Sequence, residues 1–204
     1  MKLYTSPPSP FGRKVRISAA MKGLLDTIEI VAADTSPPGN AELLEQNPLG
    51  KIPVLVLDDG SRLFDSRVIC EYLDSAGAPG TPQLFPAAGP ERWRSLTRAA
   101  LADGITDAGV LIVYEKRFRP ETHWNPGWVA RQQGKVDAGL DLLEANPPEW
   151  ATHPDYSHIS LACCLGHFDF RHDSRWRATR PRLVNWLERF AAEVASFAET
   201  MPHA

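Results

Sequence analysis

The sequence is poor in cysteine and contains no long apolar run. Its three cysteines form no C-x-x-C pair, so a disulfide framework is not expected. A chain without disulfides suits the reducing cytosol, which is the expected compartment. No apolar run approaches the roughly 20 residues of a membrane span, and the start of the chain does not resemble a signal peptide. We therefore expect a cytoplasmic protein with no membrane partner.

The sequence also lacks an excess of charge of either sign. Lys and Arg number 22 and Asp and Glu number 25, which gives a net charge of −3 at pH 7. Without a basic field, a nucleic acid is not an expected partner. The 6 histidines show no H-E-x-x-H or other spacing typical of metal ligands, so no metal site is expected.

Strong local signals are concentrated in residues 50–66, which read GKIPVLVLDDGSRLFDS. Pro53 belongs at the start of the apolar strand that follows it, because a proline inside a central strand would remove a backbone donor. Asp59 and Gly60 predict a tight hairpin turn, since glycine supplies the positive φ that such a turn requires. Ser66 then opens a helix with apolar residues at helical spacing. We expect this stretch to hold a small peptide ligand.

The residues before this stretch predict an α/β layer. Residues 2–5 are strand-like, and Ser9 with Pro10 indicates a helix start, as an N-cap followed by proline at the first helical position. That helix is expected to stop near Gly23, and residues 27–31 predict a second strand. The order strand-helix-strand, followed by strand-strand-helix, is typical of a thioredoxin-like domain.

The second half of the chain predicts only helices. Residues 78–90 are rich in Pro and Gly and indicate a linker. Residues 157–170 are strongly apolar and predict a buried central helix, while Pro181 opens a last helix with one apolar stripe. The stripe consists of Leu183, Trp186, Leu187, Phe190, Val194 and Phe197. The expected domains are a thioredoxin-like domain over residues 1–78, a linker over 79–90 and an all-helical bundle over 91–204.

Four motifs, taken in order, resemble a known family. They read SPFGRKVR from Ser9, NPLGKIP from Asn47, FDS from Phe64 and CLGHFDFR from Cys164. The whole chain resembles the cytosolic glutathione S-transferases, and SPFGRKVR resembles the first helix of their serine-type bacterial branch. The resemblance implies the glutathione transferase fold, with glutathione as co-substrate in the first domain and a small hydrophobic electrophile in the helical one. It also implies a homodimer and a role in detoxification.

The resemblance implies that Ser9 activates the glutathione thiol. The thiolate is the nucleophile, and a hydroxyl donor at a helix N-terminus favours the thiolate. A cis peptide bond before Pro53 is also implied, which turns the backbone of Ile52 toward the cysteinyl part of glutathione. From the residues alone, two simpler interpretations stay open: Ser9 as a plain helix cap, and Pro53 as an ordinary strand start.

At the γ-glutamyl end, the resemblance implies that Ser66 binds the carboxylate and Asp65 the ammonium group of glutathione. A simple N-cap is compatible with both roles. Lys51 is a candidate for the glycyl carboxylate, with a solvated surface lysine as the alternative. The electrophile site is expected between the two halves, although aromatic residues at such positions are also typical of core packing. Its candidates are Phe11, which also belongs to the glutathione site, and Tyr114, Phe118 and Trp124.

One departure from the family pattern concerns the buried helix. Many members cap it with Ser or Thr followed three residues later by Asp, whereas this chain has Ser157 and Ser160 at these positions. A capping box with serine at the second position is expected to be weaker.

Two other functions remain open at the level of sequence. A glutathione-dependent reductase or isomerase is one, but a mixed-disulfide route through position 9 is closed because Ser9 is not a cysteine. The other is a non-catalytic interaction protein that resembles glutathione transferases. Such relatives tend to lose the glutathione residues, and this chain keeps Ser9, Ile52, Pro53, Asp65 and Ser66.

Overall fold

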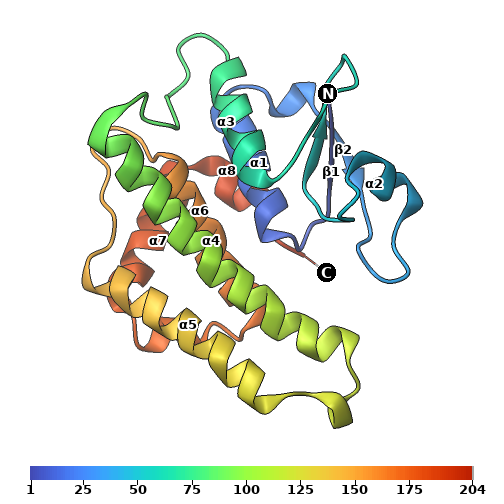
Figure 1. Ribbon diagram of the computed structural model, residues 1–204. Coiled ribbons are helices and arrows are strands. Elements are labelled where there is room, and N and C mark those ends of the chain that lie inside the picture. The colour runs from blue at the N-terminus through green and yellow to red at the C-terminus, as the bar shows by residue number, and fades with distance from the viewer. Residues whose placement is uncertain (204) are drawn as a thin grey trace. The chain divides into compact units, whose positions relative to one another are not determined.

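The computed structural model describes residues 1–203, which divide into two compact units (Figure 1). One unit comprises Met1–Ala87 and the C-terminal segment that begins at Val194, and the other comprises Ala88–Glu193. All strands of the described residues lie in the first unit, and the second is helical. This matches the α/β half and the all-helical half that the sequence predicts.

The first unit is built on a mixed sheet of strand order β2-β1-β3-β4. β1 runs parallel to β2 and antiparallel to β3, which pairs antiparallel with β4. Helices α1 and α3 pack against each other, and Leu43 of α2 packs with Tyr4 and Val54 on one side of the sheet. The elements are β1 (Lys2–Thr5), α1 (Pro10–Met21), η1 (Leu25–Thr27), β2 (Glu29–Ala32), α2 (Ala41–Gln46), β3 (Val54–Val56), β4 (Arg62–Leu63) and α3 (Ser66–Ala76).

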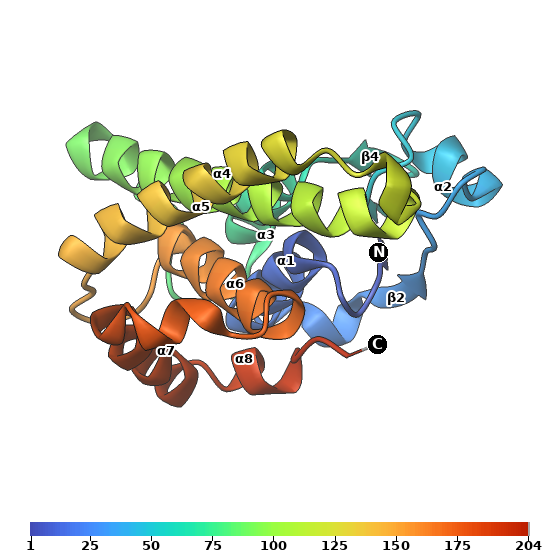
Figure 2. The same cartoon turned by 90° about the horizontal axis from the view of Figure 1, so that it is seen from below.

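The second unit is organised around its first helix. α4 contacts both α5 and α6, and Figure 2 shows α5 running alongside α4. Gly139 and Gly109 permit close approach, because an added Cβ would meet Ile105 and Phe168 respectively. α6 is buried along most of its length, as the sequence predicts. The elements are α4 (Gly89–Phe118), η2 (Glu121–His123), α5 (Pro126–Ala145), α6 (Tyr156–Arg171), η3 (Arg175–Ala178) and α7 (Pro181–Glu193).

The division into units differs from the expected domains at the linker. Residues 79–87 belong to the first unit. They are fixed there because the backbone N–H groups of Leu84 and Phe85 donate to the Asp74 carboxylate at 2.8 and 2.9 Å. Both side chains are buried, so this part of the Pro/Gly-rich stretch is structured.

The C-terminal segment also differs, because the predicted stripe does not continue to Phe197. α7 ends at Glu193, and a separate short helix, α8 (Ala195–Glu199), packs on α1 in the first unit. The buried guanidinium of Arg13 donates to the Phe197 carbonyl at 2.5 Å and lies 3.9 Å from the centroid of its ring. The prediction of one continuous helix from Pro181 to Phe197 is therefore wrong.

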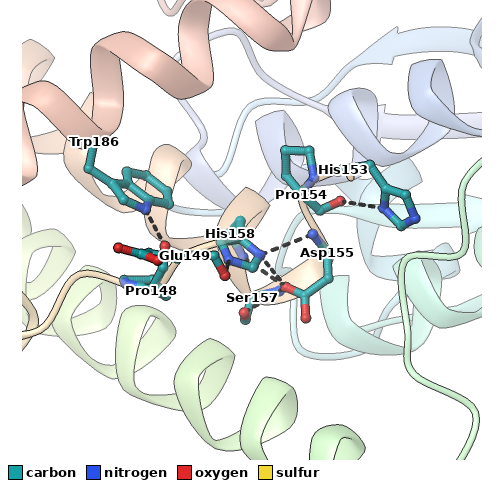
Figure 3. Close-up of polar contacts among 8 residues, drawn as sticks. All are labelled: Pro148, Glu149, His153, Pro154, Asp155, Ser157, His158 and Trp186. Carbon is teal, nitrogen blue, oxygen red and sulfur yellow. Dashed lines mark hydrogen bonds and ion pairs between the residues drawn. The ribbon is translucent and has the colours of Figure 1, made fainter. Parts of the chain in front are cut away.

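The cap of α6 lies two residues upstream of the expected position (Figure 3). Asp155 is the N-cap, and its Oδ1 accepts the N–H of Ser157 at 2.8 Å and lies 2.6 Å from Nδ1 of His158. His158 completes the capping box in place of the usual Glu or Gln. The prediction of a Ser157–Ser160 box is therefore wrong, because the carboxylate of Asp155 is the stronger acceptor for the free N–H groups.

The Asp155 carboxylate and the His158 ring of this cap interact electrostatically. Burial raises the pKa of the Asp155 carboxyl, but the hydrogen bond and charge of His158, together with the Ser157 hydroxyl, outweigh burial and hold the pKa well below its usual range. The other ring nitrogen of His158, Nε2, lies 3.3 Å from the Glu149 carbonyl. Trp186 stacks nearly parallel to the His158 ring, with 6.2 Å between centroids.

Candidate functional site

Three of the sequence-predicted segments leave the sheet at the same edge. The register pairs Tyr4 with Val54 and Leu55 with Leu63, so the end of β1, the start of β3 and the end of β4 coincide. Ser9 follows β1, Ile52 and Pro53 precede β3, and Asp65 and Ser66 follow β4. Helices α1 and α3 begin at this edge, and the N-terminus of a helix stabilises a bound anionic group.

Ser9 is the N-cap of α1, and its Oγ accepts the N–H of Gly12 at 3.0 Å. Pro10 occupies the first turn, as predicted. Within residues 1–203 the hydroxyl hydrogen of Ser9 donates to no acceptor, and the residue is half-buried. Ser9 therefore caps the helix and still has a donor available to a ligand. Sequence reasoning missed Gly12, although its place in the SPFG motif was a usable signal.

The peptide bond between Ile52 and Pro53 is cis, which confirms the geometry that the resemblance implied. Pro53 is buried, and Ile52 is half-buried against the core beside Tyr4 and Val54. Across residues 1–203, neither the N–H nor the C=O of Ile52 makes a hydrogen bond. The exposed Lys51 is anchored by its backbone, because its carbonyl accepts from the Asn47 side chain at 3.0 Å.

Asp65 is the N-cap of α3, and its carboxylate accepts the N–H of Arg67 at 2.9 Å. The Arg67 Nε also lies 3.6 Å from the same carboxylate. Asp65 is exposed, whereas Ser66 is only 3% exposed at the first helical position. The simple capping role is therefore confirmed, and it leaves one face of the Asp65 carboxylate open to solvent.

The aromatic candidates fall in different units. Phe11 is the second residue of α1, and the Lys14 ammonium lies 5.6 Å from the centroid of its ring. Tyr114 and Phe118 of α4 pack edge to face with centroids 4.9 Å apart, and each is more than a third exposed. Trp124 follows α4, and its indole N–H donates to the Arg119 carbonyl at 3.0 Å. The structure thus groups three of the four candidates at the C-terminal end of α4.

Comparison with known proteins identifies the family. A model of the glutathione S-transferase N-terminal domain matches residues 8–76, and a model of the C-terminal domain matches residues 126–189. The chain is 37% identical to the uncharacterized GST-like protein YibF of Escherichia coli (strain K12), over 99% of this chain and 98% of that protein. The chain belongs to the glutathione S-transferase family. Family membership makes it a transferase, as the sequence predicted.

Solved structures of glutathione transferases agree in fold. A family member from Pseudomonas fluorescens Pf-5 with bound glutathione is 42% identical, with a TM-score of 0.93 over 100% of this chain and 99% of that one. A second structure of such a member, with bound S-(propanoic acid)-glutathione, is 41% identical, with a TM-score of 0.88 and full coverage of both chains. The thioredoxin-like half and the helical half are therefore confirmed as the glutathione transferase fold.

The residues present fit glutathione as the co-substrate of this family. Two helix N-termini with a hydroxyl each, Ser9 and Ser66, suit a thiolate and a carboxylate. The unpaired backbone groups of Ile52 suit a peptide in an extended conformation. Residues 1–203 contain no cluster of three or more His, Cys, Asp or Glu that could hold a metal ion. No helix within this range is long and apolar enough to cross a membrane.

Proposed function

We propose that the chain binds glutathione at the sheet edge described above and activates its thiol for addition to a small hydrophobic electrophile. One observation carries the proposal: the Ser9 hydroxyl, the Ile52 backbone and the Asp65–Ser66 helix start share one edge of the sheet, and the Ser9 donor is unused. The relatives with bound glutathione and with bound S-(propanoic acid)-glutathione support it, because the second of these ligands is a glutathione with a substituent on sulfur.

Ser9 is the proposed catalytic residue, in the manner of the serine-type bacterial branch. A free thiol has a pKa of about 8.5, so most of it is protonated at neutral pH. The Ser9 hydroxyl donates to the sulfur, and the N-terminal N–H groups of α1 add positive partial charge. Each pKa unit corresponds to about 1.4 kcal/mol, which is the size of effect that one such hydrogen bond supplies.

The rest of glutathione is held by the other residues of this edge. The N–H and C=O of Ile52, held by Pro53, pair with the cysteinyl backbone. Ser66 and the N–H groups of α3 bind the γ-glutamyl carboxylate, and Asp65 binds the ammonium group. Lys51 supplies a point charge for the glycyl carboxylate.

The helical unit supplies the electrophile site. Its candidates are Tyr114 and Phe118, which are exposed, and the partly exposed Trp124, all at the C-terminal end of α4. Phe11 of α1 belongs to the glutathione site of the first unit. We assign a detoxification role on this chemistry, since conjugation makes an apolar electrophile polar. The three cysteines, all within residues 1–203, are buried and form no disulfide, which supports a cytoplasmic location.

The test measures glutathione binding and conjugation to a chlorinated aromatic acceptor, for the wild type, Ser9→Ala and Ser75→Ala. Ser9→Ala should lower kcat about tenfold or more with a small change in the KM for glutathione, because the lost hydrogen bond acts on developing thiolate charge. Ser75→Ala, which removes an exposed hydroxyl on α3, should match the wild type. Wild-type protein that binds no glutathione would contradict the proposal. Binding without conjugation would favour a glutathione-dependent reduction or isomerisation, or a non-catalytic role.

A further inference from the structure

One buried polar group at this edge has no role in the site described so far. Thr5 is the last residue of β1 and only 2% exposed. Within the described part of the chain, residues 1–203, its Oγ1 makes no hydrogen bond. A buried hydroxyl without a partner lowers stability, and the great majority of such groups in native proteins are paired. The hydroxyl of Thr5 therefore requires an explanation other than stability.

The Thr5 hydroxyl lies against the first turn of α1. A Cβ added to Gly12 would overlap Thr5 Oγ1, and the Cβ of Ser9 lies 3.4 Å from that same position. The N–H of Gly12 is the group that donates to Ser9 Oγ. The Thr5 hydroxyl, the Gly12 main chain and Ser9 thus occupy one small region.

The strand register places Thr5 beside the second element of the site as well. β1 and β3 pair Leu3 with Leu55 and Tyr4 with Val54, so the next position along the register brings Thr5 opposite Pro53. Side chains alternate along a strand, so Thr5 shares the face of the buried Leu3 and not that of Tyr4. Gly12 of α1 lies on this face, as the contact with Thr5 shows.

We propose that Thr5 is a positioning residue for Ser9. When glutathione binds, the Thr5 O–H donates to Ser9 Oγ, while Ser9 directs its own hydrogen at the sulfur. Ser9 Oγ already accepts the Gly12 N–H with one lone pair, and Thr5 supplies a donor for the second. A hydroxyl that accepts two hydrogen bonds is polarised and becomes a stronger donor. Catalytic hydrogen bonds often become short only in the complex, so this bond belongs to the bound state.

This inference rests on the proposed function, and the isosteric variant Thr5→Val tests it. The variant removes the hydroxyl but breaks no hydrogen bond of the free protein, so its Tm should equal or exceed that of the wild type. The thiol of bound glutathione, followed by the ultraviolet absorbance of the thiolate, should ionise about half a pH unit higher. At neutral pH, kcat should fall about threefold while the KM for glutathione changes less than twofold. Thr5→Ser, which keeps the hydroxyl, should restore the wild-type pH profile.

Two further variants complete the experiment. In a Ser9→Ala background, Thr5→Val should cause no additional shift, because residues that act through one another are not additive. Ser160→Ala is the matched control, since it removes another buried hydroxyl without a partner, in α6, and should leave the profile unchanged.

The outcomes separate this inference from the proposed function. A wild-type pH profile for Thr5→Val, or an equal shift with and without Ser9, overturns the role of Thr5. If Ser9→Ala raises the thiol pKa and Thr5→Val does not, the proposed function stands and only this inference fails. If the wild type binds no glutathione, both fail.

Discussion

At the scale of single residues, His167 shows how burial and neighbouring charges determine a protonation state. Its ring lies in α6, is 5% exposed and packs against Phe168 and His172. Burial, together with the charges of His172 and Arg171, lowers its pKa to about 3. The neighbouring His172 also has a lowered pKa, chiefly through burial. His167 therefore serves in packing, as an uncharged ring.

The lowered pKa predicts a loss of stability in acid. Because the unfolded chain binds a proton at about pH 6.5 and the folded chain does not, the free energy of unfolding falls as the pH drops from about 6.5 toward about 3, by at most about 1.4 kcal/mol per pH unit. His167→Gln should flatten this dependence in urea titrations over that range. The control His203→Gln, at an exposed position, should keep the wild-type slope. Equal slopes for the wild type and His167→Gln would contradict the assignment.

At the scale of secondary structure, α8 is held by two arginine side chains of α1, chiefly by Arg13. Arg13 is buried, donates to the Phe197 carbonyl and to Thr200 Oγ1, and stacks on the Phe197 ring. Arg16 adds a bond to the Thr200 carbonyl at 3.2 Å. A helix of five residues is too short to be stable by itself, so these contacts hold it.

Removal of this contact should release α8. Arg13→Ala should lower the free energy of unfolding by about 2–4 kcal/mol, because it removes a charged hydrogen bond to the Phe197 carbonyl and the packing of the guanidinium on its ring. Arg13→Lys should recover only part of this loss, since lysine lacks the planar fork. Hydrogen exchange of the amides in α8 would report the release directly. The control Arg175→Ala, which removes an exposed ion pair, should change the free energy of unfolding by less than about 0.5 kcal/mol. If the α8 amides of Arg13→Ala exchange as slowly as those of the wild type, other contacts hold α8.

At the scale of the whole molecule, we propose a homodimer. Large apolar side chains remain exposed in both units: Phe64 and Val68 are 37% and 48% exposed beside the start of α3, and Trp93 of α4 is 64% exposed. We place the proposed interface at Phe64 and Val68, because exposed apolar side chains that lie together are typical of an interaction surface.

Sedimentation should therefore give twice the mass of the chain. Val68→Glu should shift the equilibrium toward monomer, because a charge buried in an interface costs several kcal/mol. Leu142→Glu, at a residue of α5 that is 63% exposed, should remain dimeric. A monomeric wild type, or equal dissociation by both variants, would rule out this surface.

Local signals in the sequence determined much of the fold. The Ser9–Pro10 helix start, the bounds of β1 and the turn at Gly60 depend on neighbouring residues alone, and the structure has them where predicted. β2 begins two residues later than predicted, because Leu25–Thr27 forms a 3-10 turn first. The family motifs also identified the residues of the candidate site.

Tertiary structure decided what depends on residues distant in sequence. Arg13 holds Phe197 across 184 positions, so no local pattern could show that the last apolar stripe is divided between two units. The α6 cap, by contrast, is local, because Asp155 accepts the N–H groups of Ser157 and His158 only two and three residues away. Thr5 Oγ1 lies against Gly12 only because α1 folds back onto β1. The sequence by itself proposed the residues of the candidate site, and strand register brought their segments to one edge of the sheet, because register depends on pairing between distant segments.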